Sequence, residues 1–257
     1  MVDVKKSSNF DKLDPDDQKS VDSQINEMLL KKYKFINYNG MREDHLDKMI
    51  TESEQLNNTS NPFDDKVIII DEAHNFVSRI VNKLKVKKTS LSTKLYELIL
   101  SANNCRVVFL TGTPIINYPN EIGVLFNMLR GYIKTFYLKL DTSDTRNTIN
   151  KKFMLDIFKK EKLLDYIEYN PSKKPPVLIV TRNPFGFTNR AKKSGDSKIY
   201  AGVSSSKLGL RDDKTFISFI TKTLKTHNIK VLPKQTQVEN HKALPDLLET
   251  FKDLFID

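Results

Sequence analysis

The sequence predicts an α/β fold built on a parallel β-sheet with flanking helices, and two apolar runs carry this prediction. Residues 67–70 (Val-Ile-Ile-Ile) and 107–110 (Val-Val-Phe-Leu) have the length and the β-branched content of strands that are buried on both faces. Segments with helical spacing follow both runs. This order favours parallel strands that are joined by right-handed crossovers.

Each of the two apolar runs ends in a polar motif. The first leads into Asp71-Glu72-Ala73-His74, and the second leads into Thr111-Gly112-Thr113-Pro114. Parallel strands end at the same edge of a sheet, where such folds place their ligand sites, so we expect the motifs to share one crevice. The alternative is that the Asp-Glu pair only caps the next helix, since carboxylates favour a helix N-terminus.

The residue types in these motifs suit the hydrolysis of a nucleoside triphosphate, which needs a metal ion and a positioned water. Asp71 is suited to holding Mg²⁺, usually through a coordinated water, because this ion prefers hard oxygen ligands. Glu72 is suited to orienting and deprotonating the attacking water. His74 can pass the state of the nucleotide to Thr111 and Thr113, which requires the two strands to be neighbours.

Three longer runs carry a resemblance to a known family. The Asp71–His74 motif resembles the Walker B (DEAH) motif of superfamily-two helicases, and Thr111-Gly112-Thr113-Pro114 resembles their motif III. An asparagine at 117 and an acidic residue at 121 on an apolar helix are similar to the Swi/Snf-type branch. The runs IIIDEAHNFVSRIVNKL, FLTGTPIINYPNEIGVLFNMLRG and VTRNPFGF resemble the early-transcription-factor helicases, of poxvirus small-subunit type, of large nucleocytoplasmic DNA viruses.

The resemblance covers about residues 33–188 and implies a RecA-like sheet of the P-loop NTPase type. It implies ATP and Mg²⁺ as cofactors and ATP hydrolysis coupled to movement on DNA, or on RNA, in viral early transcription. In this family Asp71, Glu72 and His74 would be catalytic, and motif III with Gly112 would couple hydrolysis to nucleic-acid binding. The expected location is intracellular, in the host cytoplasm or the virion.

The sequence departs from the family at the phosphate-binding loop. Such a motor needs G-x-x-x-x-G-K-[ST] before the Walker B strand, and none of the eight glycines here is followed by Lys-Ser or Lys-Thr. The second motor domain with its arginine motif is also missing. We therefore expect an incomplete sheet, negligible activity of the isolated chain, and as partners the missing motor portions or a transcription-factor subunit. The alternative is a non-catalytic subunit that binds nucleic acid or protein.

The charge balance favours a polyanionic partner. The formal net charge is +10 and the pI is near 9.4, which suits nucleic acid. A solvated, lysine-rich surface is the alternative, and Arg182 at a strand end could meet either a phosphate or a carboxylate. The single cysteine excludes an internal disulfide, and no apolar run has the length of a membrane span. The candidate nucleic-acid contacts are Lys83, Lys85, Lys87, Lys88 and Arg182.

Composition and spacing, together with what the resemblance implies, predict four segments. Residues 1–32 are expected to be helical, starting at Asp14-Pro15, with Val21, Ile25, Met28 and Leu29 facing a core. Residues 33–188 form the partial RecA-like domain, which begins with a short strand at 33–37. Residues 189–210 are rich in Lys, Ser and Gly and predict a flexible loop. Residues 211–257 are expected to be helical and to lead toward the missing second motor domain.

Overall fold

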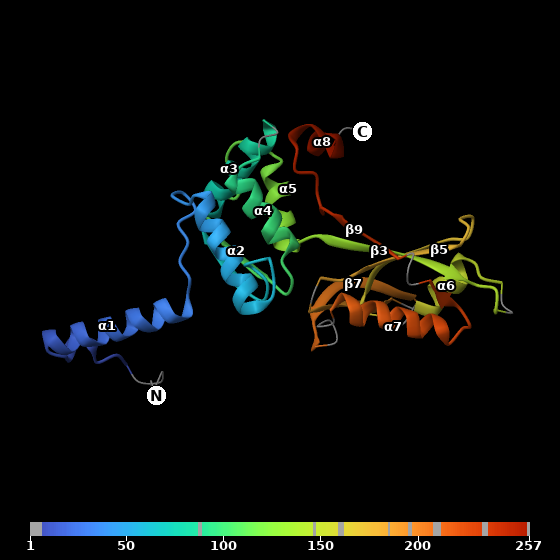
Figure 1. Cartoon of the computed structure of the whole chain (residues 1–257), viewed down its shortest axis with the longest axis horizontal. Coiled ribbons are helices and arrows are strands. Elements are labelled where there is room, and N and C mark those ends of the chain that lie inside the picture. Colours follow the sequence, from blue (N-terminus) through green and yellow to red (C-terminus); the bar gives the residue numbers. More distant parts are fainter. Residues whose placement is uncertain are drawn as a thin grey trace. The chain divides into compact units, whose positions relative to one another are not determined.

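The computed structural model describes residues 7–86, 89–145, 148–158, 162–184, 186–194, 197–207, 212–232 and 236–255. The chain divides into two compact units, Met1–Asp47 and Lys48–Asp257. Figure 1 shows the elements in sequence colours. The polar motifs identified in the sequence lie in the second unit.

The first unit contains the helix that the sequence predicts to start at Asp14-Pro15. It contains the short 3-10 helix η1 (Phe10–Lys12), helix α1 (Pro15–Lys32) and the start of α2 (Glu43–Asn57). Asp14 caps α1, because its side chain accepts hydrogen bonds from the backbone N–H groups of Asp16 and Asp17. The predicted core face of α1 is wrong, since no residue of this helix is buried and the side chain of Met28 is 64% exposed. The predicted strand at 33–37 is also not formed.

A pair of parallel strands lies at the centre of the predicted α/β region. Strand β1 (Val67–Asp71) pairs with β2 (Arg106–Leu110), and Asp71 lies opposite Leu110. Burial on both faces is contradicted, because Val67 and Ile69 of β1 are exposed. The reason is that the described part of this sheet has only two strands, so one face of the pair has no covering layer.

Three helices connect and follow these strands. They are α3 (Ala73–Lys85), α4 (Leu91–Ser101) and α5 (Glu121–Arg130), and they contact one another. Helix α5 ends at Gly131, whose φ of +70° is in the left-handed region that glycine adopts without strain. The helices bury the apolar stripes that the sequence shows, including Phe76, Ile80 and Leu95.

The following sheet is antiparallel rather than parallel. Its strands are β3 (Ile133–Asp141), β4 (Leu164–Asn170), β5 (Val177–Arg182), β8 (Lys230–Val231) and β9 (Gln237–His241), and β3 pairs with β5, β8 and β9. Residues 171–176 join β4 to β5, and such a short connection permits only antiparallel neighbours. The parallel RecA-like sheet expected over 33–188 is thus present, within the described residues, only as the β1–β2 pair.

Two helices cover one face of the antiparallel sheet and form the core with it. They are α6 (Lys151–Phe158) and α7 (Asp213–Lys225). Phe136, Leu138 and Leu140 alternate along β3 and contact the buried face of α7, where Phe216 and Ile220 are 1% and 0% exposed. Alternating burial along β3 is the pattern of a strand with one buried face.

The predicted loop at 189–210 is wrong over most of its length. Strands β6 (Phe187–Ser194) and β7 (Ser197–Ser205) form an antiparallel hairpin there. The base of the hairpin is fixed to the segment that precedes β4, because Asn189 N donates to Lys162 O at 2.7 Å. Backbone pairing between the two strands therefore orders a sequence that has few apolar side chains.

The segment 211–257 is helical only in part. Helix α7 forms as predicted, whereas β8, β9 and residues 242–247 are extended or irregular. After β9, residues 242–247 run along α4 and α5 and lead into α8 (Leu248–Lys252) and the 3-10 helix η4 (Asp253–Phe255). We call residues 242–251 the strap. Asn127 on α5 fixes the strap, because its side-chain amide accepts from Leu244 N at 2.8 Å and donates to Leu244 O at 2.9 Å.

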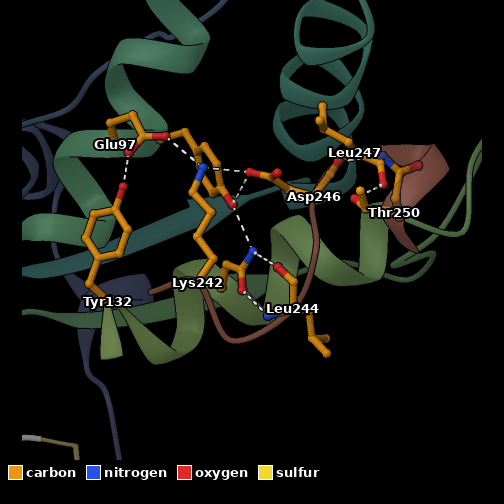
Figure 2. Close-up of polar contacts among 10 residues, drawn as sticks. Glu97, Tyr132, Lys242, Leu244, Asp246, Leu247 and Thr250 are labelled. Carbon is orange, nitrogen blue, oxygen red and sulfur yellow. Dashed lines mark hydrogen bonds and ion pairs between the residues drawn. The ribbon is translucent and has the colours of Figure 1, made fainter. Parts of the chain in front are cut away.

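Lys242 closes a charged network at the start of the strap (Figure 2). Its ammonium group lies 2.9 Å from Glu97 Oε1, 2.7 Å from Asp246 Oδ2 and 4.8 Å from the centre of the Tyr96 ring. Burial lowers the pKa of Lys242, but the hydrogen bonds and charges of Asp246 and Glu97 outweigh it and raise the pKa above the usual lysine value. Burial, followed by the charge of Asp246, raises the pKa of Tyr96.

Among the described residues, no helix combines the length and the apolar character that crossing a membrane requires.

Gly123→Ala tests the packing of the strap on α5. An alanine inside a helix usually stabilises it by about 1 kcal/mol relative to glycine. Here a Cβ atom at position 123 would lie 2.3 Å from Pro245 O, so we expect a net loss of about 1–3 kcal/mol, as for other overpacked sites. Thermal unfolding measures the change. Gly112→Ala is the control, since a Cβ there meets nothing within 4 Å. A neutral or stabilising Gly123→Ala would contradict the docked strap.

Candidate functional site

The DEAH and TGTP motifs converge at one edge of the β1–β2 pair, as the sequence predicts. Because the strands are parallel neighbours, Glu72 and Thr111 follow directly from paired strand ends. His74 Nδ1 lies 2.8 Å from Thr111 Oγ1 and 3.5 Å from Thr113 Oγ1. The reading in which the two motifs lie on opposite edges is therefore excluded.

Three oxygen atoms surround Nδ1 of His74. Besides the two threonine hydroxyls, Glu72 Oε2 lies 3.3 Å away, and the His74 side chain is only 17% exposed. Thr111 Oγ1 also accepts a hydrogen bond from Thr113 N at 3.2 Å, so its own proton is available for an unprotonated Nδ1. A protonated Nδ1 would instead donate to Glu72 or to a threonine. The hydrogen-bond partner of the ring thus depends on its protonation.

Glu72 adopts a backbone conformation that is unusual for a residue with a side chain. Its φ and ψ are 46° and 49°, in the left-handed region, where a non-glycine residue costs about 1–2 kcal/mol. The turn from β1 into α3 imposes this geometry. Its effect is to hold a 63% exposed carboxylate beside the ring of His74. Strained conformations of this kind occur often at functional sites.

The carboxylate of Asp71 is oriented by the same turn. Asp71 Oδ1 accepts a hydrogen bond from Glu72 N at 3.0 Å, and the residue is exposed. Within the described part of the chain, no group of three His, Cys, Asp or Glu side chains is arranged to hold a metal ion. A single exposed carboxylate fits Mg²⁺ that is held jointly with water and phosphate oxygens, and it does not fit a metal centre made by protein ligands alone.

The loop after Thr113 is fixed by a buried carboxylate. Glu121, 1% exposed, accepts hydrogen bonds through Oε2 from Ile116 N at 2.7 Å and Asn117 N at 3.2 Å. On the other side, Asn117 Nδ2 donates to Ser78 Oγ on α3 at 2.8 Å. Sequence reasoning did not assign these positioning roles. An acidic residue in the first turn of a helix is common, so the sequence alone did not single out Glu121 for this role.

The candidate nucleic-acid contacts are not all brought together. Lys83 and Lys85 are exposed near the end of α3, and Lys85 Nζ lies 5.1 Å from the centre of the Tyr118 ring. Lys87 and Lys88 lie outside the described residues. Arg182 is on the antiparallel sheet, where its guanidinium lies 2.8 Å from Asp213 Oδ1. Of the two partners that the sequence allows for Arg182, the carboxylate is the one observed.

Comparison with known proteins gives partial matches to viral proteins. The chain is 35% identical over 96 residues to the termination factor NPH-I homologue of African swine fever virus, with the same values for several isolates. It is 38% identical over 66 residues to a candidate ATP-dependent RNA helicase of Acanthamoeba polyphaga mimivirus. The matches cover 35% and 24% of this chain, but only 13% and 8% of the relatives. No protein-family model matches, and no solved structure matches significantly. These matches support a relationship to viral helicase-like proteins.

Glu121→Ala tests whether the buried carboxylate holds the TGTP loop. The substitution leaves the N–H groups of Ile116 and Asn117 without their acceptor, so we expect faster hydrogen exchange at these two amides. Because both bonds are only partly buried, we expect a modest loss of stability, of about 1 kcal/mol. Glu121→Gln keeps an acceptor oxygen and should have a smaller effect, and the exposed Glu54→Ala is the control. Unchanged exchange at 116 and 117 in Glu121→Ala would show that the carboxylate does not position the loop.

Proposed function

We propose that this chain carries the metal-and-water half of the nucleotide-hydrolysis site of a viral helicase-like motor. In the complete motor, ATP hydrolysis would be coupled to movement along nucleic acid during viral transcription, in the infected-cell cytoplasm or the virion. The observation that supports this most directly is the 2.8 Å contact between His74 Nδ1 and Thr111 Oγ1, which joins the two motifs across parallel strand ends. The names of the relatives, a termination factor and an RNA helicase, agree with a transcription role.

Each residue of the cluster has a role that follows from its chemistry. The Asp71 carboxylate would take a water of the Mg²⁺ shell, and the ion would neutralise charge on the transferred phosphate. The exposed Glu72 carboxylate would accept the proton of the attacking water. His74 touches both Glu72 and the threonine hydroxyls, so a change in the proton or charge at Glu72 alters its bond to Thr111.

The coupling role of motif III rests on how its loop is held. Thr111 and Thr113 contact His74, and the same loop continues to Asn117, which contacts α3 through Ser78. A rearrangement of the ring of His74 would therefore reach residues 116 and 117 through a short stretch of backbone. Because this loop is exposed, nucleic acid or another part of the motor could contact it directly.

The runner-up function is a non-catalytic subunit that binds nucleic acid or protein and keeps the motor scaffold. The sequence favours it in one respect, because it contains no G-x-x-x-x-G-K-[ST] loop to hold the β- and γ-phosphates. The chain also matches only 13% of the length of its African swine fever virus relatives. For the motor, we also propose a role in early transcription, because the sequence resembles the early-transcription-factor helicases.

We expect the isolated chain to hydrolyse ATP negligibly. Backbone N–H groups and the lysine of a phosphate loop hold the β- and γ-phosphates, and Mg²⁺ is bound jointly with them, so Asp71 cannot replace this loop. A steady-state ATPase assay with added DNA or RNA measures the activity. Turnover of about one per second, typical of enzymes, that is abolished by Glu72→Gln would overturn this expectation.

The gene separates the motor from the non-catalytic alternative. An in-frame G-x-x-x-x-G-K-[ST] within roughly a hundred codons upstream of Met1 supports the motor, because the loop precedes the Walker B strand. An ATPase assay on the longer product, with Glu72→Gln as the matched inactive variant, completes the test. A longer product that binds ATP but whose turnover is unaffected by Glu72→Gln would contradict the role given to this residue.

We expect the chain to bind single- or double-stranded nucleic acid weakly and without sequence preference. The formal charge of +10 attracts phosphates, and binding releases counterions, so affinity should fall steeply as salt rises. Fluorescence anisotropy with labelled DNA and RNA at two salt concentrations measures this. Absence of binding at low salt would favour the alternative, in which the lysines only form a solvated surface.

A further inference from the structure

One face of α3 carries a continuous polar stripe. Residues 75, 78, 79, 82 and 83 recur at the spacing that places side chains on one side of a helix. The opposite side is buried, since Phe76, Val77, Ile80 and Val81 are at most 3% exposed. The stripe therefore faces outward along a rise of about 12 Å. It consists of Asn75, Ser78, Arg79, Asn82 and Lys83.

The TGTP loop forms a second wall beside this stripe. A pocket of about 540 Å³ lies between the stripe and residues Ile116 and Asn117. The wall is fixed in the free protein, because Glu121 holds the backbone of both loop residues and Asn117 Nδ2 donates to Ser78 Oγ. The groove formed by the α3 stripe and residues 116–117 is thus preformed.

The chemistry of the groove is that of an anion site. Its lining contains one guanidinium, one ammonium group and three carboxamides, and no carboxylate. Carboxamide N–H groups and cationic side chains are the common donors to phosphate oxygens. At one end of the groove, Lys85 Nζ lies 3.4 Å from the hydroxyl of Tyr118, which extends the positive charge beyond Lys83.

The shape of the groove favours a phosphodiester backbone over a free nucleotide. No aromatic ring lines the pocket, and the ring of Tyr118 beside it is covered by Lys85, so a base in the pocket has no free ring on which to stack. Along the rise of about 12 Å, the stripe spans on the order of three phosphates of a strand, which are about 3.4 Å apart along the axis of a duplex strand. Asn75, Arg79 and Lys83 recur at every turn, about 6 Å apart along the helix axis, and so offer donors to phosphates at intervals along the strand.

We propose that the groove between α3 and residues 116–117 binds the phosphodiester backbone of a nucleic-acid strand. This inference rests on the proposed function and assigns the place where the strand lies. Because α3 begins next to His74 and the other wall is the loop that carries Thr111 and Thr113, a strand in the groove contacts the two elements that the His74 hydrogen bonds connect. Phosphate binding would thereby be linked to the geometry of the DEAH and TGTP cluster.

Salt-dependent binding of a labelled single-stranded oligothymidylate to the full chain tests the groove. The double variant Arg79→Gln/Lys83→Gln removes two charges from the stripe, and Lys222→Gln/Lys225→Gln removes two exposed charges from α7 as the matched control. Loss of two phosphate contacts should reduce the slope of log K against log salt by about 1.4 for a single strand. The α7 variant should keep the wild-type slope.

A second variant tests the groove without deleting a cation. Asn82→Asp adds a carboxylate to the stripe and should weaken binding much more than Asn240→Asp, which adds the same charge on the exposed strand β9. Circular dichroism melting checks that each variant is folded. Equal losses in both members of either matched pair would overturn the groove and leave only diffuse charge attraction.

The remaining outcomes separate failure of the groove from failure of the proposed function. Wild-type binding that is unaffected by the stripe variants overturns the groove alone, since nucleic acid is still bound. Competition by polyglutamate as effective as by unlabelled oligonucleotide, at equal total charge, overturns the phosphodiester assignment. If the wild-type chain binds no oligonucleotide at low salt, the nucleic-acid part of the proposed function fails together with the groove.

Discussion

The backbone pairing of Asp71 with Leu110 fixes the point at which both motif turns leave the sheet. Because β1 and β2 run in the same direction, the residues that follow this pair emerge at one edge, and the side chain of His74 reaches Thr111 Oγ1 at 2.8 Å. An antiparallel pairing would place the two turns at opposite ends of the strands. The oriented carboxylate of Asp71, the strained turn at Glu72 and the groove beside α3 all depend on this one parallel pair.

Helix α5 transmits this arrangement to the rest of the second unit. At its first turn, Glu121 holds the loop that follows Thr113, and Asn120 Nδ2 donates to Asp246 O of the strap at 2.7 Å. In the same turn, Gly123 leaves no space for a side chain, because Pro245 O lies against it. These buried polar and small residues lie on a helix whose remaining pattern is apolar. The helix is therefore packed between the candidate site and the strap that continues from the antiparallel sheet.

The convergence of the two motifs could be predicted because it follows from strand ends and handedness, which short stretches of sequence specify. Helix ends at Asp14 and Gly131 could be predicted for the same reason, since capping is a local interaction. The hairpin of β6 and β7 could not, because residues 189–210 have too few apolar side chains to show a strand pattern, and their order comes from backbone pairing between the two strands. The partner of Arg182 was equally undetermined, because Asp213 is distant in sequence and meets it only through tertiary packing.

The departures from local consistency cluster around the candidate site. Val67, Ile69, Val108 and Leu110 are exposed on one face of the parallel pair, whereas parallel strands usually bury both faces. Glu72 adopts a left-handed backbone conformation two residues before His74. The carboxylate of Glu121 is buried, and its hydrogen bonds hold the backbone of the loop that follows Thr113. Each feature lowers stability locally. Their occurrence around one parallel pair is what we expect of a functional site, where the positions of side chains are selected over the burial of apolar surface. Folding energy from the antiparallel sheet and its two helices offsets these costs, because that half of the unit contains a continuous apolar core. The helices beside the parallel pair contribute as well, since Phe76, Ile80 and Tyr96 are at most 3% exposed, so the exposed side chains of the candidate site lie on a packed layer.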